Sequence, residues 1–152
     1  MYITCRNANE QDANLLVGIY NAAFYDDFIR YGQCPAYGRT RARMAESVQK
    51  FPKQIIECDG WPVGALSVEN RGEGRYFVGC LCVIPKYQGR GIGTEAFRHM
   101  MAKHADWRHV ELVTPAGNVQ NIKFYTEKCG MTQGAHEMDG DVDVVRLFIE
   151  RS

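Results

Sequence analysis

Alternating glycines in the middle of the chain are typical of a turn that binds an anion. Gly89, Gly91 and Gly93 follow Val78–Ile84, an almost wholly apolar stretch that Pro85 ends. Apolar residues then recur at helical spacing, so we predict a strand buried on both faces, a glycine-rich turn and a helix over residues 91–105. Backbone N–H groups at a helix start attract negative charge, and glycine has no Cβ to hold a phosphate away. We therefore expect this stretch to bind a phosphate group.

Two motifs resemble those of the GNAT superfamily of N-acetyltransferases, and together they cover roughly the C-terminal half of the chain. Gln88–Gly93 is similar to the superfamily's pattern Gln/Arg-x-x-Gly-x-Gly/Ala, and Asn118–Met131 is similar to its later pattern Asn-x-x-Ala-x-x-Phe-Tyr-x-x-x-Gly-Phe. The resemblance implies that acetyl-coenzyme A is the cosubstrate and that its pyrophosphate lies against the glycine turn. The cofactor-binding residues implied there are Gln88, Gly89, Arg90, Gly91, Ile92, Gly93 and Thr94.

By the same resemblance, the end of the apolar strand lies beside the pantetheine arm. That arm is extended and carries two amides, so it can pair with a strand edge as another strand would. The backbone of Cys82, Val83 and Ile84 is implied to flank it, with the Val83 N–H a candidate donor to the thioester oxygen.

The second motif places three side chains on one helical face. Asn118, Ile122 and Tyr125 are four and three residues apart, which is helical spacing. Asn118 either contacts the pantetheine, as the resemblance implies, or caps the helix, and the two roles are compatible. Asn121 replaces the superfamily's usual alanine, so it is either an added polar contact to the cofactor or an exposed helix position.

Tyr125 is the candidate general acid. A phenol has an ordinary pKa of about 10 and a thiol about 8.5, so complete proton transfer to a free thiolate is uphill in water. Within hydrogen-bond reach, the phenol can nevertheless share its proton with the thiolate as the C–S bond breaks. The alternative is that Tyr125 is a core aromatic residue.

No general base is evident. Many superfamily members carry a carboxylate on the central strand, but residues 78–84 contain none. Carboxylates that are candidates by location only are Glu69, Glu73, Glu111 and Glu137. An amine of low pKa needs no dedicated base, and the question stays open at this point.

The acceptor is expected to bind near residues 24–43. Phe24, Asp27, Phe28 and Tyr31 recur at helical spacing, and an aromatic wall with a carboxylate suits a cation. The alternative is that the rings are core residues and that the carboxylate is solvated. Nearby residues that could instead select an acidic group are Tyr37, Arg39, Arg41 and Arg43. The expected reaction is acetyl transfer to a primary amine of a small molecule or peptide, by direct attack in a ternary complex.

The elements that position these residues fit a single N-acetyltransferase domain over residues 1–152. We predict the order β-α-α-β-β-β-α-β-α-β-β, an α/β (α+β) fold with a mixed, mostly antiparallel sheet flanked by helices. The expected strands are 2–6, 54–59, 61–69, 78–84, 109–114, 131–138 and 142–150, with a turn over 70–74. The expected helices begin at Asn9, Thr40, Gly91 and Asn118.

Composition argues against several other classes. The 18 basic and 18 acidic side chains cancel, so no net field attracts nucleic acid or a membrane surface. No signal peptide or membrane-spanning run is evident, and we expect a cytoplasmic protein. The six cysteines lack metal-site spacing, so we expect reduced thiols and no metal. An exposed edge on the last hairpin makes a homodimer possible.

Two other functions compete with acetyl transfer. A dinucleotide-binding oxidoreductase is suggested by glycines after a strand with Glu111 further on, although the glycine spacing differs from that fingerprint. A non-catalytic acyl-coenzyme A sensor on the same scaffold is suggested by the missing strand carboxylate.

Overall fold

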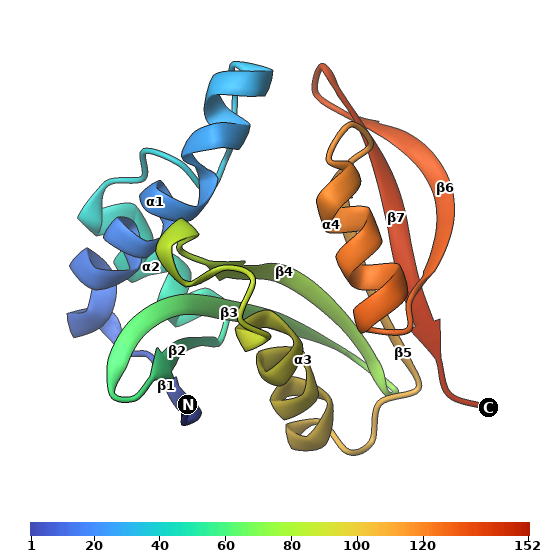
Figure 1. Ribbon diagram of the computed structural model, residues 1–152, viewed down its shortest axis with the longest axis horizontal. Coiled ribbons are helices and arrows are strands. Elements are labelled where there is room, and N and C mark those ends of the chain that lie inside the picture. The colour runs from blue at the N-terminus through green and yellow to red at the C-terminus, as the bar shows by residue number, and fades with distance from the viewer. The chain divides into compact units, whose positions relative to one another are not determined.

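The computed structural model describes all residues, 1–152, and its elements follow the predicted order (Figure 1). The strands are β1 Ile3–Asn7, β2 Lys53–Cys58, β3 Trp61–Gly72, β4 Arg75–Val83, β5 His109–Pro115, β6 Thr132–Asp139 and β7 Val142–Glu150. The α-helices are α1 Ala13–Tyr31, α2 Arg41–Lys50, α3 Ile92–Lys103 and α4 Val119–Lys123. Single turns of 3-10 helix cover Glu10–Asp12 and Pro85–Tyr87, and a π-helical turn covers Phe124–Lys128.

The sheet confirms the predicted fold class. Its strands hydrogen-bond in the order β1-β2-β3-β4-β5-β7-β6. The pairs β1–β2, β2–β3, β5–β7 and β6–β7 are antiparallel, and β4–β5 is parallel. The sheet is therefore mixed and mostly antiparallel, with β1 and β6 at its edges.

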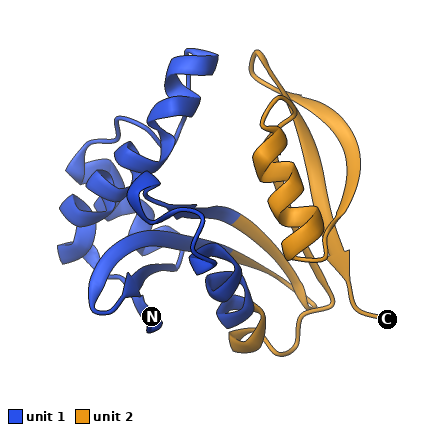
Figure 2. Cartoon of the chain, viewed as in Figure 1, with its two compact units in different colours: residues 1–68, 79–100 blue, residues 69–78, 101–152 orange.

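The chain divides into two compact units (Figure 2). Unit 1 contains residues 1–68 and 79–100, and unit 2 contains residues 69–78 and 101–152. Strands β3 and β4 and helix α3 each contribute residues to both units.

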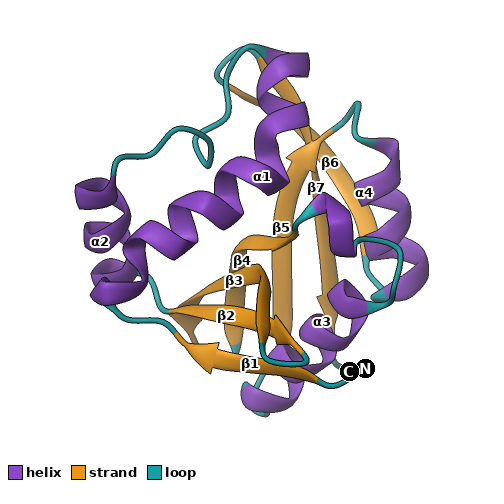
Figure 3. Ribbon diagram, turned by 60° about the vertical axis from the view of Figure 1, so that its left-hand side comes forward, coloured by secondary structure: helices purple, strands orange, loops and turns teal.

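In unit 1, the alternation of side chains along the strands builds two cores. Ile55 packs with Leu16, Tyr20 and Met44 of α1 and α2, whereas its neighbour Ile56 packs with Ile92 and Ala96 of α3. Successive strand side chains point to opposite faces, so α1 and α2 cover one face of this part of the sheet and α3 covers the other. Figure 3 shows α1 crossing the strands of this unit with α2 beside it.

In unit 2, buried residues alternate along β5, whereas on β7 the adjacent Val144 and Val145 are both buried. Val110 and Leu112 of β5 are buried, as are Val145 and Leu147 of β7, and Leu112 pairs directly with Leu147. This alternation is the pattern of a strand pair with one covered face. The helical segment that follows β5 contributes the buried Tyr125 to this unit.

Two expectations about the strands were wrong in detail. Strand β4 is not buried on both faces: Tyr76, Val78, Cys80 and Cys82 are buried, while the residues between them are at least partly accessible. The preceding turn is also shorter than predicted, because β3 continues to Gly72. The turn itself is Glu73–Gly74, where both φ angles are positive (57° and 77°), as a tight two-residue hairpin requires.

Candidate functional site

The glycine-rich turn joins the end of β4 to the start of α3 through exposed backbone. Gly89 and Gly91 have φ angles of 77° and 82°, and a Cβ at either position would have no heavy atom within 4 Å. The open space beside both glycines is where an approaching group could lie. The first N–H groups of α3, which follow Gly91 directly, have no acceptor within the helix. The turn therefore has the features that the sequence predicted for an anion site.

Side chains around the turn fix its shape and add positive charge. Gln88 Nε2 donates to the carbonyl oxygen of Val83 at 2.8 Å, which ties the turn to the last residue of β4. The Arg90 guanidinium lies 5.1 Å from the centre of the Tyr87 ring, and Lys86 lies 6.0 Å from it. Two cations thus flank the glycines, which favours an anionic ligand.

The end of β4 is held on one side by β3. Ile84 N–H donates to the Val63 carbonyl at 2.8 Å, and the Cβ that Gly64 lacks would lie 2.2 Å from the Cys82 carbonyl oxygen. The parallel pairing of β4 with β5 covers Arg75–Phe77. Beyond Phe77, the second edge of β4 is not in that ladder, as expected of a strand that offers its backbone to an extended ligand.

The helical segment after Asn118 is α-helical only over Val119–Lys123 and then widens into the π-helical turn. Asn118 is the N-cap, because its side chain accepts a hydrogen bond from the Asn121 N–H at 3.1 Å. Asn121 is exposed and donates from Nδ2 to Thr114 Oγ1 at 3.4 Å. The N-cap role of Asn118 is thus confirmed, while contact of either asparagine with a cofactor stays a prediction.

Tyr125 lies in the π-helical turn and is 6% exposed. Its ring meets Phe124 edge-on, with 5.0 Å between centroids. The hydroxyl of Thr126 donates to the Ile122 carbonyl at 2.9 Å, so it satisfies a carbonyl where the helix changes from α to π. The predicted alignment of Asn118, Ile122 and Tyr125 assumed a straight α-helix, and no local pattern indicated this widening. Such turns occur frequently at functional sites.

The acceptor candidates on α1 divide into two groups. Phe24 packs against the core, with its ring 5.9 Å from that of Tyr20, whereas Phe28 stacks on Tyr37 of the following loop at 4.6 Å. Asp27 is half-buried, and burial raises its pKa, although Arg30 opposes the shift. The buried Tyr31 hydroxyl has no hydrogen-bond partner. That these four residues bind the acceptor stays a prediction.

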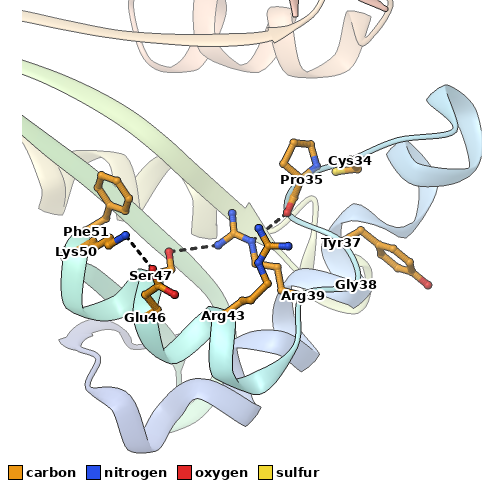
Figure 4. A pocket seen from close by; sticks show the side chains of 10 residues that line it. All are labelled: Cys34, Pro35, Tyr37, Gly38, Arg39, Arg43, Glu46, Ser47, Lys50 and Phe51. Carbon is orange, nitrogen blue, oxygen red and sulfur yellow. Dashed lines mark hydrogen bonds and ion pairs between the residues drawn. The ribbon is translucent and has the colours of Figure 1, made fainter. Parts of the chain in front are cut away.

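A pocket of about 460 Å³ lies between the loop after α1 and the exposed side of α2 (Figure 4). Its lining residues are Cys34, Pro35, Tyr37, Gly38, Arg39, Arg43, Glu46, Ser47, Lys50 and Phe51. Three of the four residues considered for an acidic group line it, and Arg41 does not. Ser47 and Lys50 were not among the residues expected here. They face the pocket because they follow Arg43 by four and seven residues on α2.

The candidate bases are mostly engaged in ion pairs. Glu69 lies 3.4 Å from Arg71, and Arg146 contacts both Glu111 and Glu137. Glu73 lies in the β3–β4 turn. None of these carboxylates is thereby assigned as a base.

All six cysteines are free thiols. A hydrogen bond with Cys80 and, after it, burial raise the pKa of Cys82 well above its ordinary value. None of the helices combines the length and the hydropathy that a membrane crossing requires.

Comparisons with known proteins agree with this architecture. An acetyltransferase from Thermus thermophilus superposes with a TM-score of 0.80 at 17% identity, covering 99% of this chain and 98% of that one. The yncA protein from Salmonella typhimurium, solved with its cofactor acetyl-CoA, superposes with a TM-score of 0.70 at 18% identity, covering 97% and 93%. At these identities the likeness shows a shared fold.

One protein has a higher sequence identity to this chain, but only over a short stretch. The uncharacterised protein YrkN of Bacillus subtilis (strain 168) is 42% identical over 48 residues, which are 32% of this chain and 26% of that protein. The matched stretch thus spans about a quarter of YrkN. The model of the acetyltransferase (GNAT) family, in contrast, matches residues 16–131, most of the chain and both motifs. The chain therefore belongs to the GNAT family of acetyltransferases.

Proposed function

We propose that this chain transfers an acetyl group from acetyl-coenzyme A to a primary amine of a small molecule or peptide, by direct attack in a ternary complex. The observation that carries the proposal is the exposed turn Gln88–Gly91, with two left-handed glycines, flanking cations and the first N–H groups of α3. The open space beside Gly89 and Gly91 admits a phosphate that a Cβ would obstruct.

The proposed binding residues for the cosubstrate fall into three sets. Gln88–Thr94 hold the pyrophosphate, the backbone of Cys82–Ile84 pairs with the pantetheine arm, and Asn118 with Asn121 contacts the arm from α4. The acetyl-coenzyme A in the structure of the Salmonella typhimurium relative supports this ligand. Bound acetyl-coenzyme A supplies an acyl group activated as a thioester.

In the proposed transfer, every bond formed and every proton moved is accounted for by the amine, the thioester and Tyr125. The lone pair of the neutral amine forms the new C–N bond to the acetyl carbon, and the C–S bond breaks. Tyr125 gives its proton to the departing sulfur, and the proton lost by the amine restores the phenol. The products are an N-acetyl amide and the free thiol of coenzyme A. The Val83 N–H is the proposed donor to the thioester oxygen, where negative charge develops.

Calorimetry and a thiol-release assay test the proposal together. We expect saturable binding of acetyl-coenzyme A and no binding of NADH, which separates this function from the oxidoreductase alternative. We then expect release of coenzyme A thiol that depends on an amine, measured across amino acids, polyamines, aminoglycosides and peptides. Absence of any affinity for coenzyme A or its acyl forms would refute the proposal.

A non-catalytic acyl-coenzyme A sensor is the second candidate. Strand β4 carries no carboxylate between Val78 and Val83, and that observation favours it. Binding of acetyl-coenzyme A with no thiol release for any amine in the panel would support the sensor over the enzyme.

A further inference from the structure

We propose that the acceptor amine carries an oxyanion, a carboxylate or a phosphonate, and that Arg39 and Arg43 bind this group in the pocket beside α2. The inference rests on the proposed function and names its substrate class: small amino acids and aminophosphonates rather than polyamines.

The charges of the pocket are unbalanced. Arg39, Arg43 and Lys50 line it together with a single carboxylate, Glu46. Glu46 pairs with Lys50 at 2.8 Å, one turn further along α2. No ion pair joins Arg39 or Arg43 to a carboxylate. Glu46 also attracts the Arg43 guanidinium electrostatically, so three cations of this pocket share a single carboxylate. An anionic ligand would supply the missing negative charge.

Arg39 is held in place before any ligand binds. Its Nε–H donates to the Pro35 carbonyl at 3.0 Å, and Nη1 donates to Ser47 Oγ at 3.3 Å. The guanidinium carbon lies 5.5 Å from the centre of the buried Tyr20 ring. A guanidinium has more N–H donors than these two bonds use, so the remaining donors can bind a ligand. A fixed guanidinium loses little rotamer freedom on binding, which favours a bidentate oxyanion.

The pocket borders the core cluster that α1 and α2 form with β4. Tyr20, under Arg39, belongs to the same core cluster as Cys80 and Cys82 of β4. Ala36, which directly follows the pocket residues Cys34 and Pro35, also packs against this cluster. The oxyanion site is therefore close to Cys80, two residues before the Cys82–Ile84 backbone proposed to flank the thioester. The proposal requires an acceptor that is bound here by its oxyanion and extends its amine toward that end of β4.

The aromatic residues nearby do not favour a cation instead. Phe28 and Tyr37 stack with 4.6 Å between centroids and 14° between planes, so each ring covers one face of the other. A cation needs an open ring face, preferably more than one. Burial raises the pKa of Asp27, the carboxylate expected to pair with a cation, although Arg30 opposes the shift. The basic pocket is the better-formed site.

Matched acceptors test the inference directly. L-amino acids are compared with their amides, and 2-aminoethylphosphonate with ethanolamine, so that each pair differs in the oxyanion. We expect the anionic member to have the higher kcat/KM by about 10- to 100-fold, as charge-assisted hydrogen bonds contribute. In the Arg39→Gln and Arg43→Gln variants, the ratio of kcat/KM between the anionic acceptor and its uncharged partner should fall toward one. The cause should be a higher KM for the anionic acceptor, while the KM for acetyl-coenzyme A stays the same.

Arg41→Gln is the matched control, because Arg41 is exposed on the same helix but does not line the pocket. It should retain the full preference. Arg39→Lys keeps the positive charge but lacks the paired N–H donors of the planar guanidinium. Its preference for the anionic acceptor should therefore lie between those of wild type and Arg39→Gln. Equal rates for both members of every pair, or no effect of the pocket variants, would overturn the inference while acetyl transfer itself stands.

A titration with methylphosphonate gives a readout that does not depend on turnover. We expect a saturable shift of the Arg39 Nε–H signal in NMR spectra of wild type, and a weaker one in Arg43→Gln. No saturable shift would overturn the inference. Failure of the proposed function would instead appear as a lack of affinity for acetyl-coenzyme A, with or without this shift.

Discussion

The hydroxyl of Tyr125 is the one group of this residue that the proposed chemistry uses. Tyr125→Phe keeps the buried ring and its edge contact with Phe124, so we expect the variant to fold. Because the departing thiolate loses its proton donor, kcat should fall by about 100-fold, the lower end for general acid catalysis, while the KM for acetyl-coenzyme A changes little. Steady-state thiol release measures both quantities.

Tyr87→Phe is the control for Tyr125→Phe, since it removes a phenol hydroxyl and leaves the ring beneath Arg90. That variant should keep its kcat. Unchanged turnover of Tyr125→Phe would exclude the phenol from the chemistry and leave it as a core aromatic residue.

Gly91 combines a left-handed backbone with open space, and the two requirements can be separated. Gly91→Ala should cost about 1 kcal/mol of stability through its positive φ, and it should weaken coenzyme A binding at least 10-fold because the new Cβ occupies the proposed phosphate site. Gly60→Ala is matched to it: its φ is 84°, its Cβ also meets nothing within 4 Å, and it lies in the β2–β3 turn. We expect the same loss of stability there, with unchanged affinity in calorimetry. Equal affinity losses in both variants would mean that strain, not the phosphate site, is responsible.

At the scale of elements, the contact between β3 and β4 positions the end of β4. A Cβ at Gly64 would lie 2.2 Å from the Cys82 carbonyl oxygen, and because that atom belongs to the backbone it cannot move alone. Gly64→Ala should therefore destabilise the protein by about 3 kcal/mol or more, at the upper end for overpacking. Chemical denaturation measures this loss.

Gly79 provides the comparison on the same pair of strands. Its Cβ would lie 3.7 Å from Ser67 Oγ, an ordinary contact, so Gly79→Ala should change stability by no more than about 1 kcal/mol. If the two variants were equally stable, the close approach at Gly64 would not hold β4 in place.

Local signals in the sequence predicted most of these elements, because their causes are local. The Asp59–Gly60 turn has positive φ angles of 51° and 84°, Thr40 accepts from the Arg43 N–H to cap α2, and Gly130 ends the last helical segment with a φ of 72°. In each case one residue type suits one backbone conformation. The element order could be predicted for the same reason.

Features that depend on irregular backbone and single side-chain contacts, rather than on a repeating pattern, could not be predicted. In the pocket beside α2, Arg39 is held by hydrogen bonds to Pro35 and Ser47. The spacing of residue types along the sequence does not predict these bonds. The π-helical turn at Tyr125 involves a bond from Thr126 to Ile122 that competes with the α-helical pattern. Both features concern the candidate site, so its residue types could be predicted more readily than its geometry.

At the scale of the whole molecule, β6 ends the sheet and seven of its eight residues are exposed. It pairs only with β7, so its outer backbone groups can pair with a second copy of the chain. The predicted homodimer would use this edge, and sedimentation equilibrium should then show a concentration-dependent dimer that Glu137→Pro weakens. Monomer at all concentrations would contradict it.

The two motifs of the proposed site belong to different units, and this allows a test of whether both bind the cosubstrate. Residues 88–94 lie in unit 1 and residues 118–125 in unit 2. If coenzyme A contacts both, its addition should slow amide hydrogen exchange in both segments, by about 10-fold or more at saturating ligand. Global stabilisation slows exchange everywhere, so the comparison needs amides that exchange through local motion. The exposed turns at Asp59–Gly60 in unit 1 and Gly140–Asp141 in unit 2 serve as internal controls. Protection of residues 88–94 alone would exclude Asn118, Asn121 and Tyr125 from the cosubstrate site, whereas greater protection of both segments than of the two control turns would place both motifs on one ligand.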